Sequence, residues 1–293
     1  MTTQQSRWAY LAVLTPLIWA TTYYLTTEFL PPGRPWLASL VRSLPTGLVL
    51  VIGSRPPTGR WWSRLLLLSV LYSSGFFPLL FLAAYRLPGG VASVINSLGP
   101  ILVVLLSVKL LDVPIKGIDL IAGAVGVTGV ALLVLTDQAR LDPLGIAAMV
   151  TCVVMISLGN VLAKRWGTPP GMTSLHLTGW LFLLGGLTLL PATLLFEGLP
   201  TDLSTRNWLG YAYLVIFGGI VSYALWFWAL RRLTASAVTF LGLLNPVAAA
   251  LIGWVLLDQR LSTGQLIGAA LVVVSVLLGQ VTAMTRSPVA RPG

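Results

Sequence analysis

Residues 229–279 read ALRRLTASAVTFLGLLNPVAAALIGWVLLDQRLSTGQLIGAALVVVSVLLG. Two apolar runs, Thr234–Leu257 and Ser262–Gly279, flank one short polar turn. Each run is long enough to cross the hydrocarbon core of a bilayer as a helix, which takes roughly 20 residues over about 30 Å. The second run begins with Gly264 and Gly268, a spacing of small residues that lets two membrane helices approach closely. The stretch therefore predicts two membrane-spanning helices joined by a tight turn.

The same stretch recurs 146 residues earlier, at residues 83–133. At this offset Pro100 matches Pro246, and the pair Leu120-Ile121 matches Leu266-Ile267. Proline inside an apolar run removes a backbone donor, so the helix is expected to be disturbed there. We interpret the match as an internal duplication of half of the protein.

The composition indicates a polytopic membrane protein. Hydrophobic residues make up 56% and charged residues 9% of the 293 residues, whereas a soluble domain carries about 25% charged residues. The net charge of +10 does not indicate nucleic-acid binding, because the basic residues stand singly or in pairs between apolar runs. Cys152 is the sole cysteine, which excludes an intrachain disulfide and a thiolate metal cluster. The first apolar run, from Trp8 to Leu25, is expected to be a retained span rather than a signal peptide.

Ten membrane spans are expected, joined by short loops. They cover residues 8–27, 36–53, 62–84, 90–111, 117–135, 143–163, 172–196, 208–230, 234–257 and 262–284. With the N-terminus inside the cell, twelve Lys and Arg residues fall on the cytoplasmic side and five on the other, which favours cytoplasmic termini. The two copies of the duplicated stretch are five spans apart, so they must run in opposite directions.

The predicted fold is an all-α membrane protein of ten helices, arranged as two inverted five-helix repeats at residues 1–138 and 139–293. Inverted repeats of this kind are typical of secondary transporters, whose binding site lies near the midplane between the halves. The two halves would rock around that site by alternating access. The expected flexing points are Pro16, Pro78, Pro100 and Pro246.

The sequence lacks the motifs of an enzyme or an ATPase. It contains no G-x-x-x-x-G-K-[ST] loop, no H-E-x-x-H motif and no G-x-S-G motif, and no cofactor is expected. All eight acidic residues lie at span ends or in loops, so His176 is the candidate for a proton-carrying group inside the membrane. In the alternative, His176 sits at the cytoplasmic interface and couples nothing. Facilitated efflux or exchange fits the sequence equally well.

Arg42 lies several residues inside the second expected span. A cation at that depth is expected to face a protein interior or a water-filled cavity. There its planar head could pair with a substrate carboxylate. The alternative is a side chain that snorkels to the outer surface.

Aromatic and amide side chains supply the remaining candidates. Trp19 and Tyr72 lie deeper in their spans than the interfacial aromatic belt, so they are predicted to line a cavity. The asparagines in the spans are predicted to be buried, either bonding a neighbouring helix or contacting substrate. Spans five and ten carry no aromatic residue and are expected to be peripheral packing helices. The full set of candidate substrate-binding residues is Trp19, Tyr23, Arg42, Tyr72, Phe76, Asn96, Ser157, Asn160, His176, Trp180, Tyr223 and Asn245.

Residues 229–279 resemble the second domain signature of the EamA family in the drug/metabolite transporter (DMT) superfamily. The resemblance rests on an A-L-x-x-L-x-A opening, a central proline, a polar turn and an L-I-G start to the last span, and it extends to Trp19 and Arg42 in the first half. It implies a ten-helix inverted-repeat exporter with cytoplasmic termini and a central cavity lined by spans one to four and six to nine. YddG-type members of the family export aromatic amino acids. The family usually has Glu in the turn before the last span, where this chain has Gln259, so a role of that acid does not carry over.

The sequence therefore predicts an exporter of small metabolites in the inner or plasma membrane, with amino acids, aromatic ones included, as the expected substrates. Other metabolites or drug-like cations are the alternative substrates, and a passive channel is the alternative mechanism. The expected partners are a small-molecule substrate and the lipid bilayer, without nucleic acid, and the protein is expected to be a monomer.

Overall fold

The computed structural model describes residues 3–87, 89–134, 142–200, 202–256 and 262–284, and every regular element in these ranges is helical. In chain order the elements are α1 (Thr3–Phe29), α2 (Pro35–Leu50), α3 (Trp61–Ser69), η1 (Val70–Ser74), α4 (Phe76–Arg86), α5 (Gly89–Asn96), α6 (Gly99–Leu111), α7 (Gly117–Val134), α8 (Pro143–Trp166), α9 (Ser174–Phe196), α10 (Thr205–Val215), η2 (Ile216–Val221), α11 (Ser222–Arg232), α12 (Ala235–Leu241), α13 (Leu244–Leu256) and α14 (Thr263–Met284). The segments η1 and η2 are π-helical. The predicted turn that contains Gln259 lies outside the described residues.

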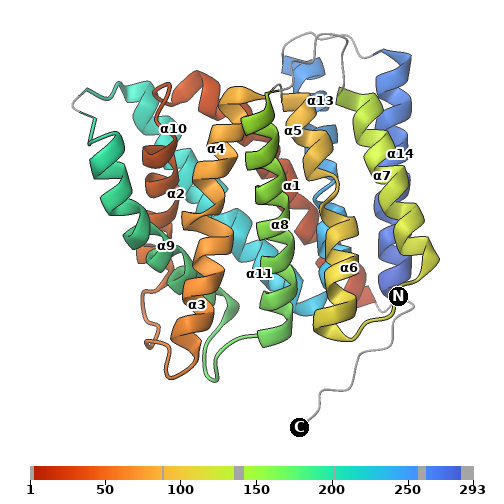
Figure 1. Ribbon diagram of the computed structural model, residues 1–293, viewed down its shortest axis with the longest axis horizontal. Coiled ribbons are helices and arrows are strands. Elements are labelled where there is room, and N and C mark those ends of the chain that lie inside the picture. Colours follow the sequence, from red (N-terminus) through yellow and green to blue (C-terminus); the bar gives the residue numbers. More distant parts are fainter. Residues whose placement is uncertain (1–2, 88, 135–141, 201, 257–261, 285–293) are drawn as a thin grey trace.

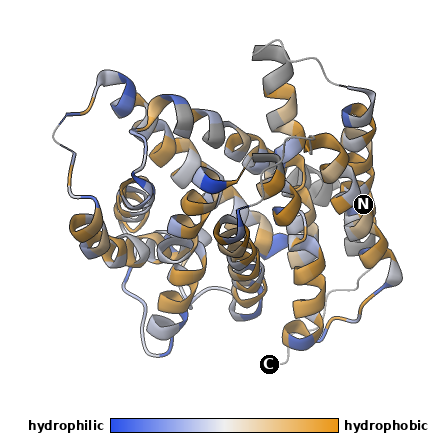
Figure 2. Cartoon of the chain, turned by 45° about the horizontal axis from the view of Figure 1, so that its top comes forward, coloured by the Kyte–Doolittle hydropathy of each residue, from blue (hydrophilic) through white to orange (hydrophobic). Residues whose placement is uncertain are grey.

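The helices form a membrane-type bundle. Eight helical stretches of the described chain are long and apolar enough to cross a membrane. They correspond to the third to tenth predicted spans, while α1, with 27 residues, and α2, with 16, cover the first two predicted ranges. Figure 1 shows the helices standing side by side, with α9 and α10 at one edge and α7 and α14 at the other. Hydrophobic residues run along the helices, and hydrophilic residues gather near their ends and in the loops (Figure 2). The prediction of an all-α membrane protein is confirmed at this level.

One close crossing joins α2 to α9. The two helices pack along much of their length. Gly186 of α9 lies against Leu44 of α2, and a Cβ atom on Gly186 would stand only 2.6 Å from the Cα atom of Leu44. The close approach therefore depends on the absence of a side chain at this position.

A second close crossing joins α7 to α14. A Cβ atom on Gly268 would stand 2.6 Å from the carbonyl oxygen of Gly129, so the predicted close approach at Gly268 is confirmed. Seven residues further along each helix, the Ser275 hydroxyl donates a hydrogen bond of 2.6 Å to the carbonyl oxygen of Ala122. Gly264, by contrast, is exposed and approaches no backbone of another helix.

Irregular helical segments occur at equivalent places in the two parts of the chain. The π-helical segment η1 begins at Val70 and η2 begins at Ile216, 146 residues later. The break between α5 and α6 falls at residues 97–98, and the break between α12 and α13 falls at residues 242–243. The offset that relates the two copies of the sequence thus relates, within one residue, their departures from regular α-helix as well.

Three of the four prolines predicted as flexing points lie at or near breaks or π-helical segments, and the fourth, Pro16, lies inside a continuous helix. Pro100 follows the first break within the first two residues of α6, where a missing N–H is tolerated. Pro246 lies near the start of α13, and Pro78 lies near the start of α4, just after η1. Pro16 lies inside α1, and its carbonyl oxygen accepts a hydrogen bond of 3.3 Å from Nδ2 of Asn245.

The start of α8 is held by a half-buried acid. The Asp142 side chain caps the helix by accepting a hydrogen bond of 2.7 Å from the backbone N–H of Gly145. Its other carboxylate oxygen lies 3.3 Å from Nη1 of Arg86, at the end of α4. The Gly145 N–H and, to a smaller degree, the Arg86 guanidinium lower the pKa of Asp142, because both stabilise the ionised carboxylate.

Candidate functional site

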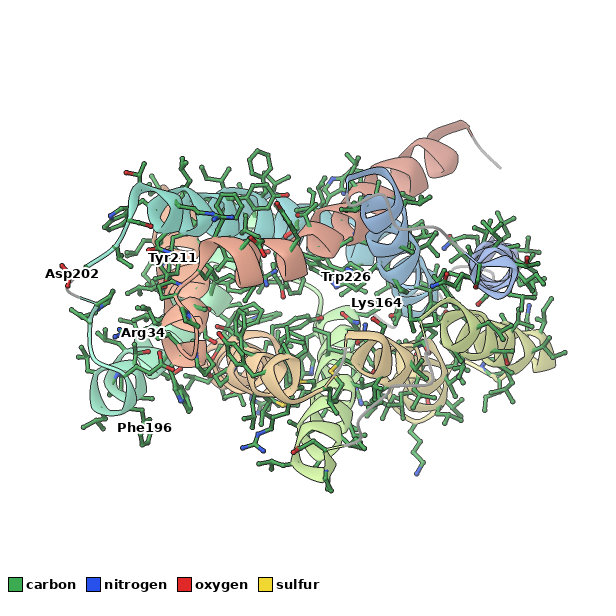
Figure 3. The ribbon with its side chains drawn as sticks, turned by 90° about the horizontal axis from the view of Figure 1, so that it is seen from above. Arg34, Lys164, Phe196, Asp202, Tyr211 and Trp226 are labelled. Carbon is green, nitrogen blue, oxygen red and sulfur yellow. The ribbon has the colours of Figure 1, made fainter. Side chains whose placement is uncertain are left out.

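Seven polar and aromatic side chains from six helical segments meet inside the bundle, and we call them the central cluster. They are Trp19, Arg42, Tyr72, Phe77, Asn160, Tyr223 and Trp226. The contributing segments are α1, α2, η1, α4, α8 and α11. Trp226 lies near the middle of the bundle seen from above, while Arg34, Phe196 and Asp202 lie toward one edge (Figure 3).

Arg42 points into the protein. It is 3% exposed, and its Nη2 atom donates a hydrogen bond of 2.8 Å to the carbonyl oxygen of Gly218 in η2. Its guanidinium carbon lies 4.7 Å from the ring centroid of Phe77 and 5.6 Å from that of Tyr223. These contacts favour a charged guanidinium in a desolvated setting. Of the two expectations for Arg42, the buried one is therefore correct and snorkelling is not observed.

Asn160 receives two hydrogen bonds on one oxygen. The Tyr72 hydroxyl donates to Oδ1 over 2.6 Å, and the Trp226 indole N–H donates to the same atom over 3.0 Å. The side chain is 1% exposed, and its Nδ2 atom has no hydrogen-bond partner in the described part of the chain. A buried amide N–H₂ group without a partner is costly, so this atom is a candidate donor to a ligand.

Trp19 links the aromatic part of the cluster to the polar part. Its ring lies 5.1 Å, centroid to centroid, from both Tyr223 and Trp226. Its indole N–H donates a hydrogen bond of 2.9 Å to the Ser222 hydroxyl, which in turn donates over 2.6 Å to the Gly218 carbonyl that also receives Arg42. Trp19 and Tyr72 thus contact the protein interior rather than forming part of an interfacial belt.

Three further predicted residues lie in contacts between helices near the cluster. Ser157 is buried and donates a hydrogen bond of 3.4 Å to the carbonyl oxygen of Gly99, and Asn245 bonds α13 to α1 as described above. Phe76 is half-buried and packs against Phe77 at a centroid distance of 5.5 Å.

Other predicted residues lie apart from these contacts. Trp180 donates to the Ser54 hydroxyl over 3.0 Å and contacts the exposed ring of Trp62. His176 is half-buried in the first turn of α9, where its backbone N–H is capped by Thr173. Asn96 was predicted to be buried, and this is wrong, because it ends α5 at the break before Pro100 and is exposed there. Tyr23 belongs to α1, but its side chain lies outside the described part of the structure.

Sequence reasoning missed Phe77, Trp226, Ser222 and Phe182. Phe182 of α9 lies 4.6 Å, centroid to centroid, from Tyr223. Trp226 follows Tyr223 by three residues, so helical spacing places both on one face, and this signal could have found it. For Phe76 and Phe77, which are adjacent, no sequence pattern indicates which of the two faces inward.

The chain resembles known membrane transporters along nearly its whole length. The EamA-like transporter family matches residues 6–135 and 143–279. The "Protein PecM" of Dickeya dadantii (strain 3937) is 40% identical over 269 residues, which cover 92% of this chain and 91% of that protein. The "Uncharacterized inner membrane transporter YedA" of Escherichia coli (strain K12) is 23% identical, covering 89% of this chain and 87% of that protein. A solved crystal structure with 20% sequence identity matches with a TM-score of 0.78, covering 95% of this chain and 98% of that one, and shows that the fold is shared.

A match to the family over both parts of the chain, together with a relative of 40% identity, establishes the relationship. The relatives are transporters of the DMT type, which identifies this protein as a transporter and not an enzyme. The chain belongs to the EamA-like transporter family.

Proposed function

We propose that this transporter exports amino acids, aromatic ones included, and that the central cluster holds the substrate. The observation that carries the proposal is that the cluster holds two buried donors. Arg42 lies beside aromatic rings, and the amide nitrogen of Asn160 has no hydrogen-bond partner among the described residues. An arginine and an amide N–H₂ group are both donors, and together they suit the carboxylate of an amino acid. The rings of Trp19 and Trp226 offer faces for an aromatic side chain.

The alternative substrates differ in how they would meet Arg42. A drug-like cation would be repelled by a buried guanidinium, and none of the seven residues of the cluster is acidic. The Phe77 and Tyr223 ring faces, which could hold a ligand cation, already face the guanidinium of Arg42. Another metabolite with a carboxylate would bind Arg42 and the Asn160 amide as an amino acid does. The preference for aromatic amino acids therefore rests on the aromatic rings of the cluster.

For the mechanism we propose alternating access by two inverted repeats, residues 1–138 and 139–293, within a bundle of ten spans. The 146-residue spacing of η1 and η2 and the two segments matched by the family, 6–135 and 143–279, support the division. Tyr72 is 0% exposed and Trp226 is 4% exposed, so a substrate could reach them only after the helices around them move. Pro16, Pro78, Pro100 and Pro246 are proposed as the flexing points of this motion.

We further propose that both termini face the cytoplasm of a cell whose inner membrane holds the protein as a monomer. The distribution of Lys and Arg supports the orientation. The name of the Escherichia coli relative, an inner membrane transporter, supports the location. Because His176 lies in the first turn of α9 and not beside the central cluster, facilitated export or exchange is favoured over proton coupling through this residue.

The test is transport in proteoliposomes that contain the purified protein. Vesicles are loaded with radiolabelled tryptophan, threonine or a sugar, and efflux is followed with and without a proton gradient. We expect protein-dependent efflux of tryptophan without a gradient, accelerated by unlabelled tryptophan on the opposite side. Absence of amino acid efflux would overturn the substrate, and efflux insensitive to substrate on the opposite side would indicate a passive channel.

A further inference from the structure

A surface cavity lies outside the central cluster, between the start of α9 and the end of α11. It is a pocket of about 630 Å³, which is within the size range of small-molecule sites. The lining residues are Thr173, Ser174, Leu175, Ala224, Leu225, Trp228, Arg231 and Arg232. Neither the proposed substrate residues nor the family match assigns a role to it.

The pocket opens on the outer side of α11. The buried residues of this helix include Tyr223, Trp226 and Phe227, which face the other helices. The lining residues Ala224 and Trp228 are only half-buried, and they lie on the opposite side of the helix. A ligand in this pocket would therefore be approached from the surroundings of the bundle and not through the central cluster.

Both ionisable lining residues are arginines. Nη1 of Arg231 donates a hydrogen bond of 2.9 Å to the Ser174 hydroxyl, which holds this side chain across the space between α11 and α9. The guanidinium carbon of Arg232 lies 4.2 Å from the ring centroid of Trp228. Two guanidinium groups fixed at one pocket, with no acid among the lining residues, suit an anion that offers several oxygen acceptors.

The helix ends reinforce this positive field. The N-terminus of α9 carries partial positive charge, as every helix start does. The C-terminus of α11 would oppose it, but the Lys164 ammonium donates hydrogen bonds to the carbonyl oxygens of Leu230 and Leu233, over 2.8 and 2.6 Å. A full positive charge therefore offsets the partial negative charge of that helix end.

The remaining lining is apolar and reaches the surface. Leu175 is 43% exposed at the first turn of α9, and Leu225 and Trp228 continue the apolar lining along α11. Both helices belong to stretches long and apolar enough to span the bilayer, and the pocket lies at their ends, where lipid headgroups are found. Trp residues at this level are typical of the membrane interface.

We propose that this pocket binds the phosphate headgroup of an anionic glycerophospholipid, with Arg231 and Arg232 contacting the phosphate and the acyl chains lying along Leu175 and Leu225. Basic pockets between membrane helices are known to hold anionic headgroups. The proposal does not depend on which substrate is transported.

The test compares lipids with the same acyl chains on the full chain in dodecyl maltoside. Native mass spectrometry measures binding of phosphatidylglycerol and phosphatidylcholine. We expect the parent protein to bind phosphatidylglycerol about tenfold or more tightly than phosphatidylcholine. Both lipids carry the phosphate, but phosphatidylcholine adds a quaternary ammonium group, which the two guanidinium groups would repel. The double variant Arg231→Gln with Arg232→Gln should lose this preference, and the matched variant Arg55→Gln with Arg60→Gln, in an exposed loop, should keep it.

Two further measurements keep the proposal falsifiable if the arginine variant does not fold. Ala224→Trp fills the pocket, retains both arginines and is expected to remove the preference for phosphatidylglycerol. Glycerol 3-phosphate in solution is expected not to displace the lipid. Equal binding of the two lipids by the parent, an unchanged preference in Ala224→Trp, or displacement by soluble glycerol 3-phosphate would each overturn the assignment to a lipid.

Discussion

The hydroxyl of Tyr72 and Oδ1 of Asn160 lie 2.6 Å apart, in a hydrogen bond that joins η1 to α8 across 88 residues of sequence. Trp226 donates to the same oxygen. Rotating the amide by half a turn would place its N–H₂ group against the Trp226 indole N–H, which can only donate, so the oxygen is fixed toward it. Asn160 Nδ2 is thereby held in a single orientation, facing away from both, as a donor that a substrate could meet.

Tyr72→Phe removes one of the two bonds that fix the amide. The loss of a buried hydrogen bond costs about 1 kcal/mol of stability, and the freed amide should bind substrates less selectively. We expect the ratio of tryptophan to threonine efflux to fall, with the protein still folded in size-exclusion chromatography. An unchanged ratio would mean that the amide does not contact substrate.

Arg42→Gln tests the carboxylate contact. Glutamine retains a donor for the Gly218 carbonyl but removes the charge, and a hydrogen bond between charged groups contributes about 1.5–3 kcal/mol. Amino acid efflux should therefore fall by about 10- to 100-fold, with Arg42→Lys intermediate because it keeps the charge but not the planar pair of donors. Arg55→Gln, in an exposed loop, is the control. Transport equal to that of the parent in Arg42→Gln would exclude this residue from the site.

Trp19→Ala is expected to change which substrates are exported. Its ring contacts both Tyr223 and Trp226, so its removal opens space beside these two rings. Competition of unlabelled amino acids with labelled tryptophan should show a shift toward other side chains. Trp61→Ala, at the start of α3 and stacked with Arg64, should leave the ranking of competitors as it is. The same shift in both variants would indicate a general loss of packing.

Gly268→Leu should separate α7 from α14. Overpacking costs typically 1–3 kcal/mol, and here the new side chain would meet the backbone at Gly129, which has no room to yield. We expect a clear fall in the unfolding temperature measured in detergent. Gly264→Leu, four residues earlier and exposed, should have little effect; comparable losses in both variants would show that the crossing is not responsible.

Asp142 makes the stability of the helix bundle depend on pH in the acid range. The pKa of Asp142 is lowered in the folded protein from the ordinary value of 3.8. The ionised carboxylate therefore stabilises the fold fully above pH 3.8, and this stabilisation is lost as the pH falls through the pKa of the folded state. Asp142→Asn can still cap α8 but does not titrate. Between about pH 5 and pH 3 the parent's unfolding temperature should fall more steeply than that of the variant. Asp112→Asn, exposed at the end of α6, is the matched control, and parallel curves for parent and Asp142→Asn would contradict the prediction.

The sequence predicted what depends on composition and spacing along the chain. The apolar runs predicted the helices, and Gly268 predicted a close crossing, because both follow from local patterns. It could not predict that the Trp19 indole bonds Ser222, 203 residues away, because that contact depends on the rotation of two packed helices. Asn96 shows that a local pattern can also predict burial wrongly. Its position in an apolar run suggested burial, but the break before Pro100 exposes it.

The carbonyl oxygen of Gly218 accepts from both Arg42 and Ser222, and Ser222 accepts from Trp19. This series of hydrogen bonds connects α1 through α11 to α2. The α11 and α2 side chains meet at the Gly218 carbonyl, inside the π-helical segment η2. A substrate ring that displaced the Trp19 indole would leave the Ser222 hydroxyl free to turn, and the guanidinium would then be the sole side chain on that carbonyl. Binding of the substrate ring and binding of its carboxylate would thus both alter the hydrogen bonds on the Gly218 carbonyl oxygen. This atom lies in η2, where the backbone hydrogen bonds already depart from the α-helical pattern.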